Sequence, residues 1–127
     1  GSAKVSIADV DEAEEKIERH KVVDLIDTQP RQAQVVLHAI LDTSRGSSKF
    51  IFTGEVYELY KKYCTKIGLR PLTQRRVSDI LSELDMLGMI TARVISKGRY
   101  GRTREIMLAP QAATPAVKRI LSEAIGL

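Results

Sequence analysis

Residues 88–108 read GMITARVISKGRYGRTREIML, and this stretch decides the fold. Two segments of alternating apolar residues, the pattern of β-strands, flank a loop that contains Gly98 and Gly101. Glu105 is the only acid among five cations, and Tyr100 lies at the expected tip. The cations are Arg93, Lys97, Arg99, Arg102 and Arg104. Because like charges this close repel one another, we predict that the hairpin meets a polyanion.

Directly upstream, residues 73–87 have the pattern of an amphipathic helix. Thr73 is the expected N-cap, and Gly88 is expected to end the helix. The apolar positions have helical spacing: Val77, Ile80, Leu81, Leu84 and Leu87. The other face carries Gln74, Arg75, Ser78, Asp79 and Ser82, and Asp79 is expected to pair with Arg75 or Arg76. A capped helix followed by a basic hairpin predicts a winged helix.

The rest of the chain supplies the other elements of such a fold. Helices are expected over residues 7–26, 30–42, 53–67 and 116–125, and residues 50–52 form a short strand. Thr53 is the expected N-cap of the third of these helices, and Gly68 its end. Tyr57, Tyr60 and Tyr63 are interpreted as core and rim residues. The predicted fold class is mainly α with a small antiparallel β-sheet, a winged helix-turn-helix with an additional helix at each end.

Charge divides the chain of 127 residues into an acidic head and a basic body. Residues 1–27 hold four basic and eight acidic residues, and residues 28–127 hold 16 basic and eight acidic residues. The break before Pro30 predicts a boundary near residue 28, with the winged-helix domain over 29–127. Gly1 and Ser2 are typical of a tag remnant.

Location is predicted from what the sequence lacks. There is no signal-peptide pattern and no apolar run near the roughly 20 residues of a membrane span. Cys64 is the only cysteine and is expected to be half-buried in a helix, so no intrachain disulfide can form. We therefore expect a cytoplasmic protein that does not engage a membrane. The basic body favours nucleic acid as a partner, so we also expect the protein to be nucleoid-associated.

We interpret the helix and the hairpin as two parts of a grip on duplex DNA. Gln74 and Arg75, near the start of the helix, can each read a base edge in the major groove by two hydrogen bonds, and Arg76 lies beside them near a phosphate. Arg99 suits the minor groove, and Tyr100 can pack against sugars. Phosphates are assigned to Arg93, Lys97, Arg102 and Arg104. About five neutralised phosphates predict a slope of log affinity against log salt near −4 to −5.

Other readings of these residues are less well supported. A basic hairpin can be only a sheet edge protected from aggregation, but arginines with glycines and an aromatic between them favour DNA. Residues 46–49 read GSSK and lack the spacing of a phosphate loop, and there is no nucleophile motif. His20 and His38 lack companions, so no metal site is expected.

The predicted α-helix and basic hairpin also resemble a known protein family in their sequences. Residues 72–88, LTQRRVSDILSELDMLG, and 96–104, SKGRYGRTR, closely resemble the C-terminal winged-helix domain of archaeal replication initiators. These are relatives of the eukaryotic origin recognition complex and its cell-division-control partner. Residues 54–60, GEVYELY, resemble that domain's second helix. Residues 8–18 resemble the last helix of an ATPase lid, so residues 1–28 would combine the tag remnant with that helix.

The resemblance implies a parent protein that binds double-stranded origin DNA and helps to load the replicative helicase. It implies DNA contacts for eight residues: Thr73, Gln74, Arg75, Arg76, Arg99, Tyr100, Gly101 and Arg102. The family's ATPase core, which would bind ATP or ADP with magnesium, would lie upstream. For this fragment we expect no enzymatic activity, no cofactor and a monomeric state.

Two alternatives keep the same fold. A transcription regulator would dimerise on a palindrome through the final helix. The apolar stripe of that helix, Val117, Ile120, Leu121 and Ile125, is more simply explained by packing on its own domain. A protein-interaction module would instead bring the basic hairpin to an acidic partner such as a helicase subunit.

Overall fold

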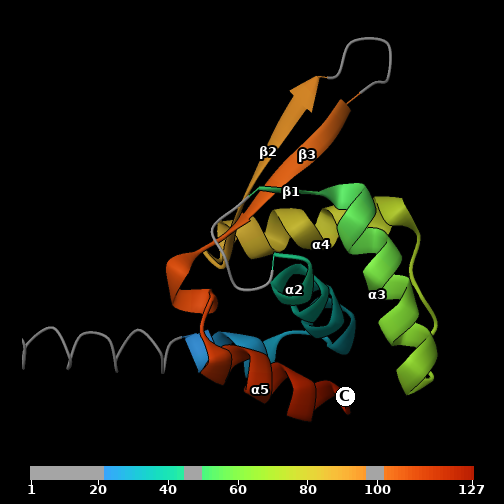
Figure 1. Ribbon diagram of the computed structural model, residues 1–127, viewed down its shortest axis with the longest axis vertical. Helices are drawn as coiled ribbons and strands as arrows, with labels where there is room; N and C mark the ends of the chain where they lie inside the picture. Colours follow the sequence, from blue (N-terminus) through green and yellow to red (C-terminus); the bar gives the residue numbers. More distant parts are fainter. Residues whose placement is uncertain (1–21, 45–49, 97–101) are drawn as a thin grey trace, which may run out of the picture.

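The computed structural model describes residues 22–44, 50–96 and 102–127. Within them lie α2 (Arg31–Ser44), α3 (Thr53–Ile67), α4 (Gln74–Met86) and α5 (Pro115–Ile125), and residues 22–28 are helical too. Figure 1 shows α2 in the middle with the other three helices around it. Accordingly, nine residues of α2 are buried, and its apolar run forms the centre of the core. None of these helices combines the length with the apolar content that a membrane span requires.

Three strands form one antiparallel sheet in the order β1-β3-β2, which confirms the predicted sheet. The strands are β1 (Ile51–Phe52), β2 (Ile90–Ser96) and β3 (Arg102–Leu108). In the hairpin of β2 and β3, Ile90 pairs with Leu108 and Ser96 with Arg102. Figure 1 shows this hairpin, called the wing below, projecting beyond the helices above α4. The element order and the sheet confirm the winged-helix prediction.

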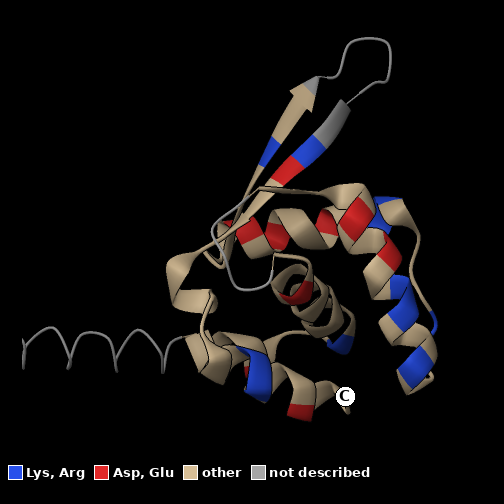
Figure 2. Cartoon of the chain, viewed as in Figure 1, with Lys and Arg blue, Asp and Glu red and all other residues tan. Residues whose placement is uncertain are grey.

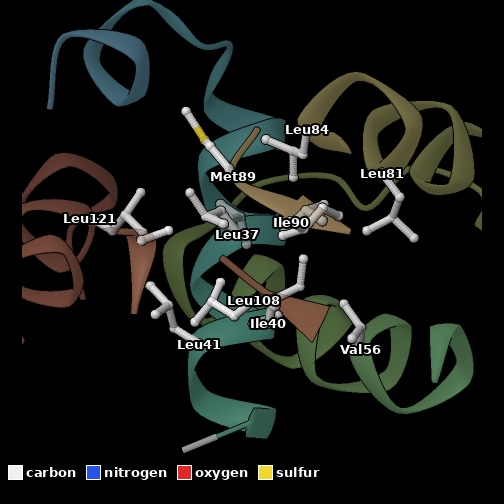
Figure 3. Packing of buried hydrophobic residues seen from close by; sticks show 14 of the residues in the cluster. Leu37, Ile40, Leu41, Val56, Leu81, Leu84, Met89, Ile90, Leu108 and Leu121 are labelled. Carbon is white, nitrogen blue, oxygen red and sulfur yellow. The ribbon is translucent and has the colours of Figure 1, made fainter. Parts of the chain in front are cut away.

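The wing joins the core only at its base. Ile90 and Leu108 are buried together with Leu81 and Leu84 of α4, as the close view in Figure 3 shows. Val94 continues the alternation that begins at Ile90, but it is 54% exposed. Val94 lies beyond the edge of the core. At this position the alternation of apolar residues along β2 therefore no longer predicts which side chains are buried.

The end of α4 differs from the predicted apolar stripe in one residue. Leu87 is 37% exposed, whereas Met89 is buried. Gly88 has φ +80°, which turns the chain so that the Met89 N–H donates to the Leu84 carbonyl at 3.1 Å. The glycine ends the helix as predicted, and the turn carries Met89 into the core in place of Leu87.

The start of α3 corrects a prediction. Phe52, not Thr53, is the N-cap residue, and Thr53 is the first residue of the helix with its side chain buried. The apolar Phe-Ile-Phe run ends in the cap position, so the short strand passes directly into the helix. Gly68 ends α3 with φ +72°, as predicted. Cys64 is fully buried rather than half-buried.

The helical segment before α2 and the last helix, α5, both contribute to the core. Val22 and Ile26 of the preceding helical segment are buried, and Gln34 Nε2 donates to the Ile26 carbonyl at 2.9 Å. The end of the acidic head therefore packs with the winged helix, while the division at residue 28 stays a prediction. Val117 and Leu121 of α5 are also buried, as expected for a helix that packs on its own domain.

Candidate nucleic-acid interface

The first turn of α4 exposes three polar side chains. Thr73 is the N-cap, and its Oγ1 accepts the Arg76 N–H at 3.3 Å, which confirms the predicted cap. Gln74, Arg75 and Arg76 are exposed, whereas Val77 is buried, and no acid lies in this turn. Cations at this end oppose the helix dipole, so helix stability does not account for them. A phosphate would be attracted both by the helix end and by the two guanidinium groups.

Two tyrosines of α3 hold the segment that leads into α4. The Tyr57 hydroxyl donates to the Leu72 carbonyl, and the Leu72 N–H donates to the Tyr60 hydroxyl oxygen, both at 2.9 Å. Tyr60 also donates to Gln32 Oε1 on α2, and Gln32 Nε2 donates to the Arg70 carbonyl at 2.9 Å. Burial raises the pKa of Tyr60 to about 12, so this hydroxyl stays protonated and can donate.

These bonds confirm that the tyrosines belong to the core and its rim: Tyr60 is buried, and Tyr57 and Tyr63 are partly buried. The bonds of Tyr57 and Tyr60 also hold the loop that leads into α4, a role that the sequence did not indicate. Gln32 was missed altogether. A glutamine in the first turn of a helix is unremarkable in sequence, and only the fold brings it to the loop before α4.

Arg93 lies on the outer face of the wing beside two neighbours. Its guanidinium donates to the carboxylate of Glu105, directly opposite on β3, at 2.7 Å. It also lies over the Phe50 ring, 5.6 Å from the ring centroid. The Arg93 side chain is still 65% exposed, so it can reach a ligand while paired. Glu105 offsets part of its charge, and its predicted phosphate contact stays a prediction.

Arg104 has partners within the protein. Its Nη1 donates to the Ser78 carbonyl and to Ser82 Oγ, both at 2.8 Å, and the residue is partly buried between β3 and α4. Arg104 is thus engaged within the protein, and its predicted phosphate contact stays a prediction. Ser78, a predicted DNA contact, is partly covered at the same junction.

The other predicted residues of the wing follow β2 in the sequence. Lys97, Arg99, Tyr100 and Gly101 fall outside the described residues. Arg102 opens β3, where its backbone pairs with Ser96. Their predicted contacts with phosphates, sugars and the minor groove therefore stay predictions.

Acidic residues occupy α4 beyond its first turn. Figure 2 shows these acids along the helix, while basic segments lie on both strands of the wing. They are Asp79, Glu83 and Asp85. No ion pair in the described ranges joins Asp79 to Arg75 or Arg76, so the predicted pairing is wrong. Because carboxylates repel phosphates, only the start of α4 is suited to approach DNA closely.

A further polar cluster connects α2 with α5. His38 Nε2 lies 2.8 Å from Ser122 Oγ, and its Nδ1 lies 3.5 Å from Asp42 Oδ2. Lys118 Nζ pairs with Asp42 Oδ1 at 2.6 Å. Burial lowers the pKa of His38, with Asp42 opposing that shift and Lys118 adding to it. His38 is 4% exposed, so the arrangement stabilises the helix contact and offers no access to a substrate.

The hollow at the end of α4 and the histidine, cysteine and acidic side chains of the described residues do not form a second site. An open apolar hollow of about 240 Å³ is lined by Glu83, Met86 and Leu87, without converging polar groups. No group of three or more histidine, cysteine or acidic side chains within these residues could hold a metal ion.

Known proteins are similar to this chain in sequence and in fold. The family model described as CDC6, C terminal winged helix domain matches residues 24–114. ORC1-type DNA replication protein 1 of Sulfurisphaera tokodaii is 48% identical over 109 residues, covering 86% of this chain and 27% of that protein. The ORC1-type DNA replication protein of Pyrococcus abyssi is 49% identical over 108 residues, covering 85% and 26%. The chain thus spans about a quarter of the length of these relatives.

Two solved structures are similar to the chain. The Aeropyrum pernix ORC1 protein in complex with DNA gives a TM-score of 0.80 at 44% sequence identity, over 94% of this chain and 31% of that one. Cdc6p from Pyrobaculum aerophilum gives a TM-score of 0.61 at 22% identity, over 81% of this chain and 26% of that one, and so shares the fold.

Proposed function

The chain belongs to the CDC6 C-terminal winged-helix domain family, and from this membership we propose that it binds double-stranded DNA at replication origins as a domain of a replication initiator. The observation that carries the proposal is the first turn of α4, where Arg75 and Arg76 are exposed at the positive end of a helix. The similar ORC1 protein of Aeropyrum pernix, solved in complex with DNA, supports the same function.

The proposed complex places α4 in the major groove. Gln74 and Arg75 point to base edges, and a matched bidentate contact discriminates between bases by about 1–3 kcal/mol. Thr73 and Arg76 contact the flanking phosphate. The acids after the first turn limit how deeply the helix enters, because Asp79 and Glu83 would meet phosphates if the whole helix lay in the groove.

The wing is proposed to enter the adjacent minor groove. Arg99 reads the negative potential of a narrow segment, and Lys97, Tyr100, Gly101 and Arg102 contact the backbone. Arg93 adds a phosphate contact from the exposed outer face, weakened by its pair with Glu105. Arg76, Arg93, Lys97, Arg99 and Arg102 would then neutralise about five phosphates, so the salt slope stays near −4 to −5.

Two further activities of a replication initiator, nucleotide binding and helicase loading, are proposed for the parent protein. By resemblance, we propose an ATPase core that binds ATP or ADP with magnesium, and the replicative helicase as a second partner. The winged-helix domain itself is proposed as a monomeric DNA-binding module without catalysis. The burial of Val117, Leu121 and Ile125 against the domain leaves the apolar stripe of α5 occupied, which disfavours a dimer through this stripe.

Binding of a labelled origin duplex, measured by fluorescence anisotropy at several salt concentrations, tests the proposal. We expect log affinity to fall linearly with log salt. Arg75→Ala should weaken specific binding by about tenfold, the equivalent of 1–2 kcal/mol at a base contact. The paired substitution Arg99→Ala with Arg102→Ala should lower the magnitude of the slope by about two.

Arg119→Ala is the matched control, because Arg119 is an exposed arginine on α5, away from α4 and the wing. It should leave affinity and slope nearly unchanged. A flat salt response of the unsubstituted chain, or equal losses at Arg75 and Arg119, would contradict the proposed interface.

A further inference from the structure

Arg104 occupies an unusual place in the wing. In the β2–β3 register Arg104 lies opposite Val94, and Ile106 lies opposite Ala92. Alternation therefore puts Arg104 on the same face as Ile106, the face that packs on the core. Ile106 is fully buried, whereas Val94 is 54% exposed. Arg104 thus lies where the wing leaves the core, two residues before the buried Ile106 on the same face of β3.

From this position the side chain bridges to α4. Nη1 donates at 2.8 Å to both the Ser78 carbonyl and Ser82 Oγ. Ser82 Oγ in turn donates to the Ser78 carbonyl at 3.3 Å. The two serines are one helical turn apart, so the guanidinium is held against a single face of the helix. Hydrogen bonds from a charged donor are stronger than neutral ones, and this pair is partly shielded from water.

We propose that Arg104 is a positioning residue, whose contact with Ser78 and Ser82 fixes the angle between the wing and α4 so that both fit one duplex. This inference rests on the proposed DNA-binding function. Beyond its buried base the wing is a two-stranded ribbon, which gains little stability of its own. Without the Arg104 contact, this outer part of the wing would sample a wider range of angles relative to α4. DNA binding would then have to order it. Arg104 acts through the wing and α4, and its own charge is not used on a phosphate.

A phosphate contact and a positioning contact give different salt responses. Removing a side chain that neutralises one phosphate lowers the magnitude of the salt slope by about one. Removing a positioning contact weakens binding at every salt concentration and leaves the slope unchanged. Ser82→Ala separates the two further, because it removes a partner of Arg104 and no charge.

The experiment combines anisotropy titrations over a salt series with residual dipolar couplings of the free protein. The variants are Arg104→Ala, Ser82→Ala and the double variant. Arg119→Ala is the control for loss of an exposed arginine, and Thr65→Ala for loss of a hydroxyl bonded to the carbonyl four residues earlier. Circular dichroism confirms that each variant is folded at the temperature used, and Ser82→Ala keeps the test open if Arg104→Ala is unfolded.

We expect Arg104→Ala and Ser82→Ala each to weaken binding by about three- to tenfold, the cost of ordering a freed segment, with unchanged slopes. The double variant should bind no more weakly than Arg104→Ala. Dipolar couplings of the wing amides should share one alignment tensor with α4 in the unsubstituted chain and shrink in both variants. The two controls should match the unsubstituted chain.

Three results would overturn the inference. One is a slope reduced by about one in Arg104→Ala with unchanged binding by Ser82→Ala, which identifies a phosphate contact. Another is wing couplings that stay unchanged in both variants. The third is an unsubstituted chain with no salt-dependent duplex binding, which overturns the proposed function and this inference with it. The first two leave the proposed function standing, so the two failures are distinguishable.

Discussion

At the scale of single residues, hydrogen bonds from side chains far away in sequence hold the loop that leads into α4. Tyr60 is central, since its hydroxyl accepts from the Leu72 N–H and donates to Gln32. Both partners are partly buried. The loss of one phenolic oxygen would therefore leave a backbone donor and an amide oxygen without this partner just ahead of the predicted base-reading turn.

Tyr60→Phe should lower the free energy of unfolding by about 1–3 kcal/mol, the usual cost of leaving a buried polar group unpaired. It should also weaken duplex binding, because the start of α4 becomes less well fixed. Urea unfolding and anisotropy measure the two effects. Tyr63→Phe is the matched control: the Tyr63 ring packs edge-on against His38 rather than on the loop before α4, and DNA binding should stay unchanged.

His38 predicts a pH dependence of stability. Burial lowers its pKa below the ordinary 6.5, so the unfolded chain takes up a proton at a higher pH than the folded chain. The free energy of unfolding should therefore fall as the pH drops below about 6.5, and the full loss is reached below the folded-state pKa. Burial is the main cause of the lowered pKa of His38, the nearby carboxylate of Asp42 opposes the shift, and the Lys118 ammonium adds to it.

Urea unfolding between about pH 7 and pH 5 tests this dependence. His38→Gln should flatten it, because glutamine does not titrate, even if its stability at pH 7 is lower. An equally steep loss of stability in His38→Gln would show that other groups cause it.

At the scale of elements, α4 and α5 start in the same way but differ in use. Thr73 and Thr114 are both N-caps, with Oγ1 atoms that accept from Arg76 N–H at 3.3 Å and Val117 N–H at 3.2 Å. Only α4 belongs to the proposed interface. The two caps therefore form a matched pair for separating stability from binding.

Thr73→Ala and Thr114→Ala should each lower the free energy of unfolding by about 0.5–2 kcal/mol. Only Thr73→Ala should also weaken duplex binding under conditions where both variants are folded, since it loosens the first turn of α4. Chemical denaturation and anisotropy on the same samples give both values. Equal binding losses in the two variants would place the effect in general stability rather than in α4.

Elements that are specified by local sequence patterns could be predicted, whereas contacts between distant residues could not. The wing, α4 and their order follow from local patterns: alternation, helical spacing, Thr73 and Gly88. The start of α3 was misplaced by one residue, because a threonine after an apolar run also fits the first helical turn. The position of Arg104 carried a signal that was overlooked, since its alternation with Ile106 and Leu108 places it on the core face.

At the scale of the whole molecule, the core of the winged helix includes residues from both ends of the described chain. Val22 and Ile26 come from the acidic head and Ile125 from the last helix. No local pattern could show that the end of the head helix packs inward, because tertiary contacts decide it. The contact between Gln32 and the loop before α4 was unpredictable for the same reason.

The central claim is that the first turn of α4 and the wing together form the surface that binds DNA. Amide chemical-shift mapping of the ¹⁵N-labelled chain, titrated with an origin duplex, tests it most directly. The account predicts saturable shifts concentrated at Gln74–Arg76 and at the wing, with small changes along α5 and in the C-terminal half of α4. Saturable shifts centred on α5 or on Met86 and Leu87, with the first turn of α4 unaffected, would contradict it.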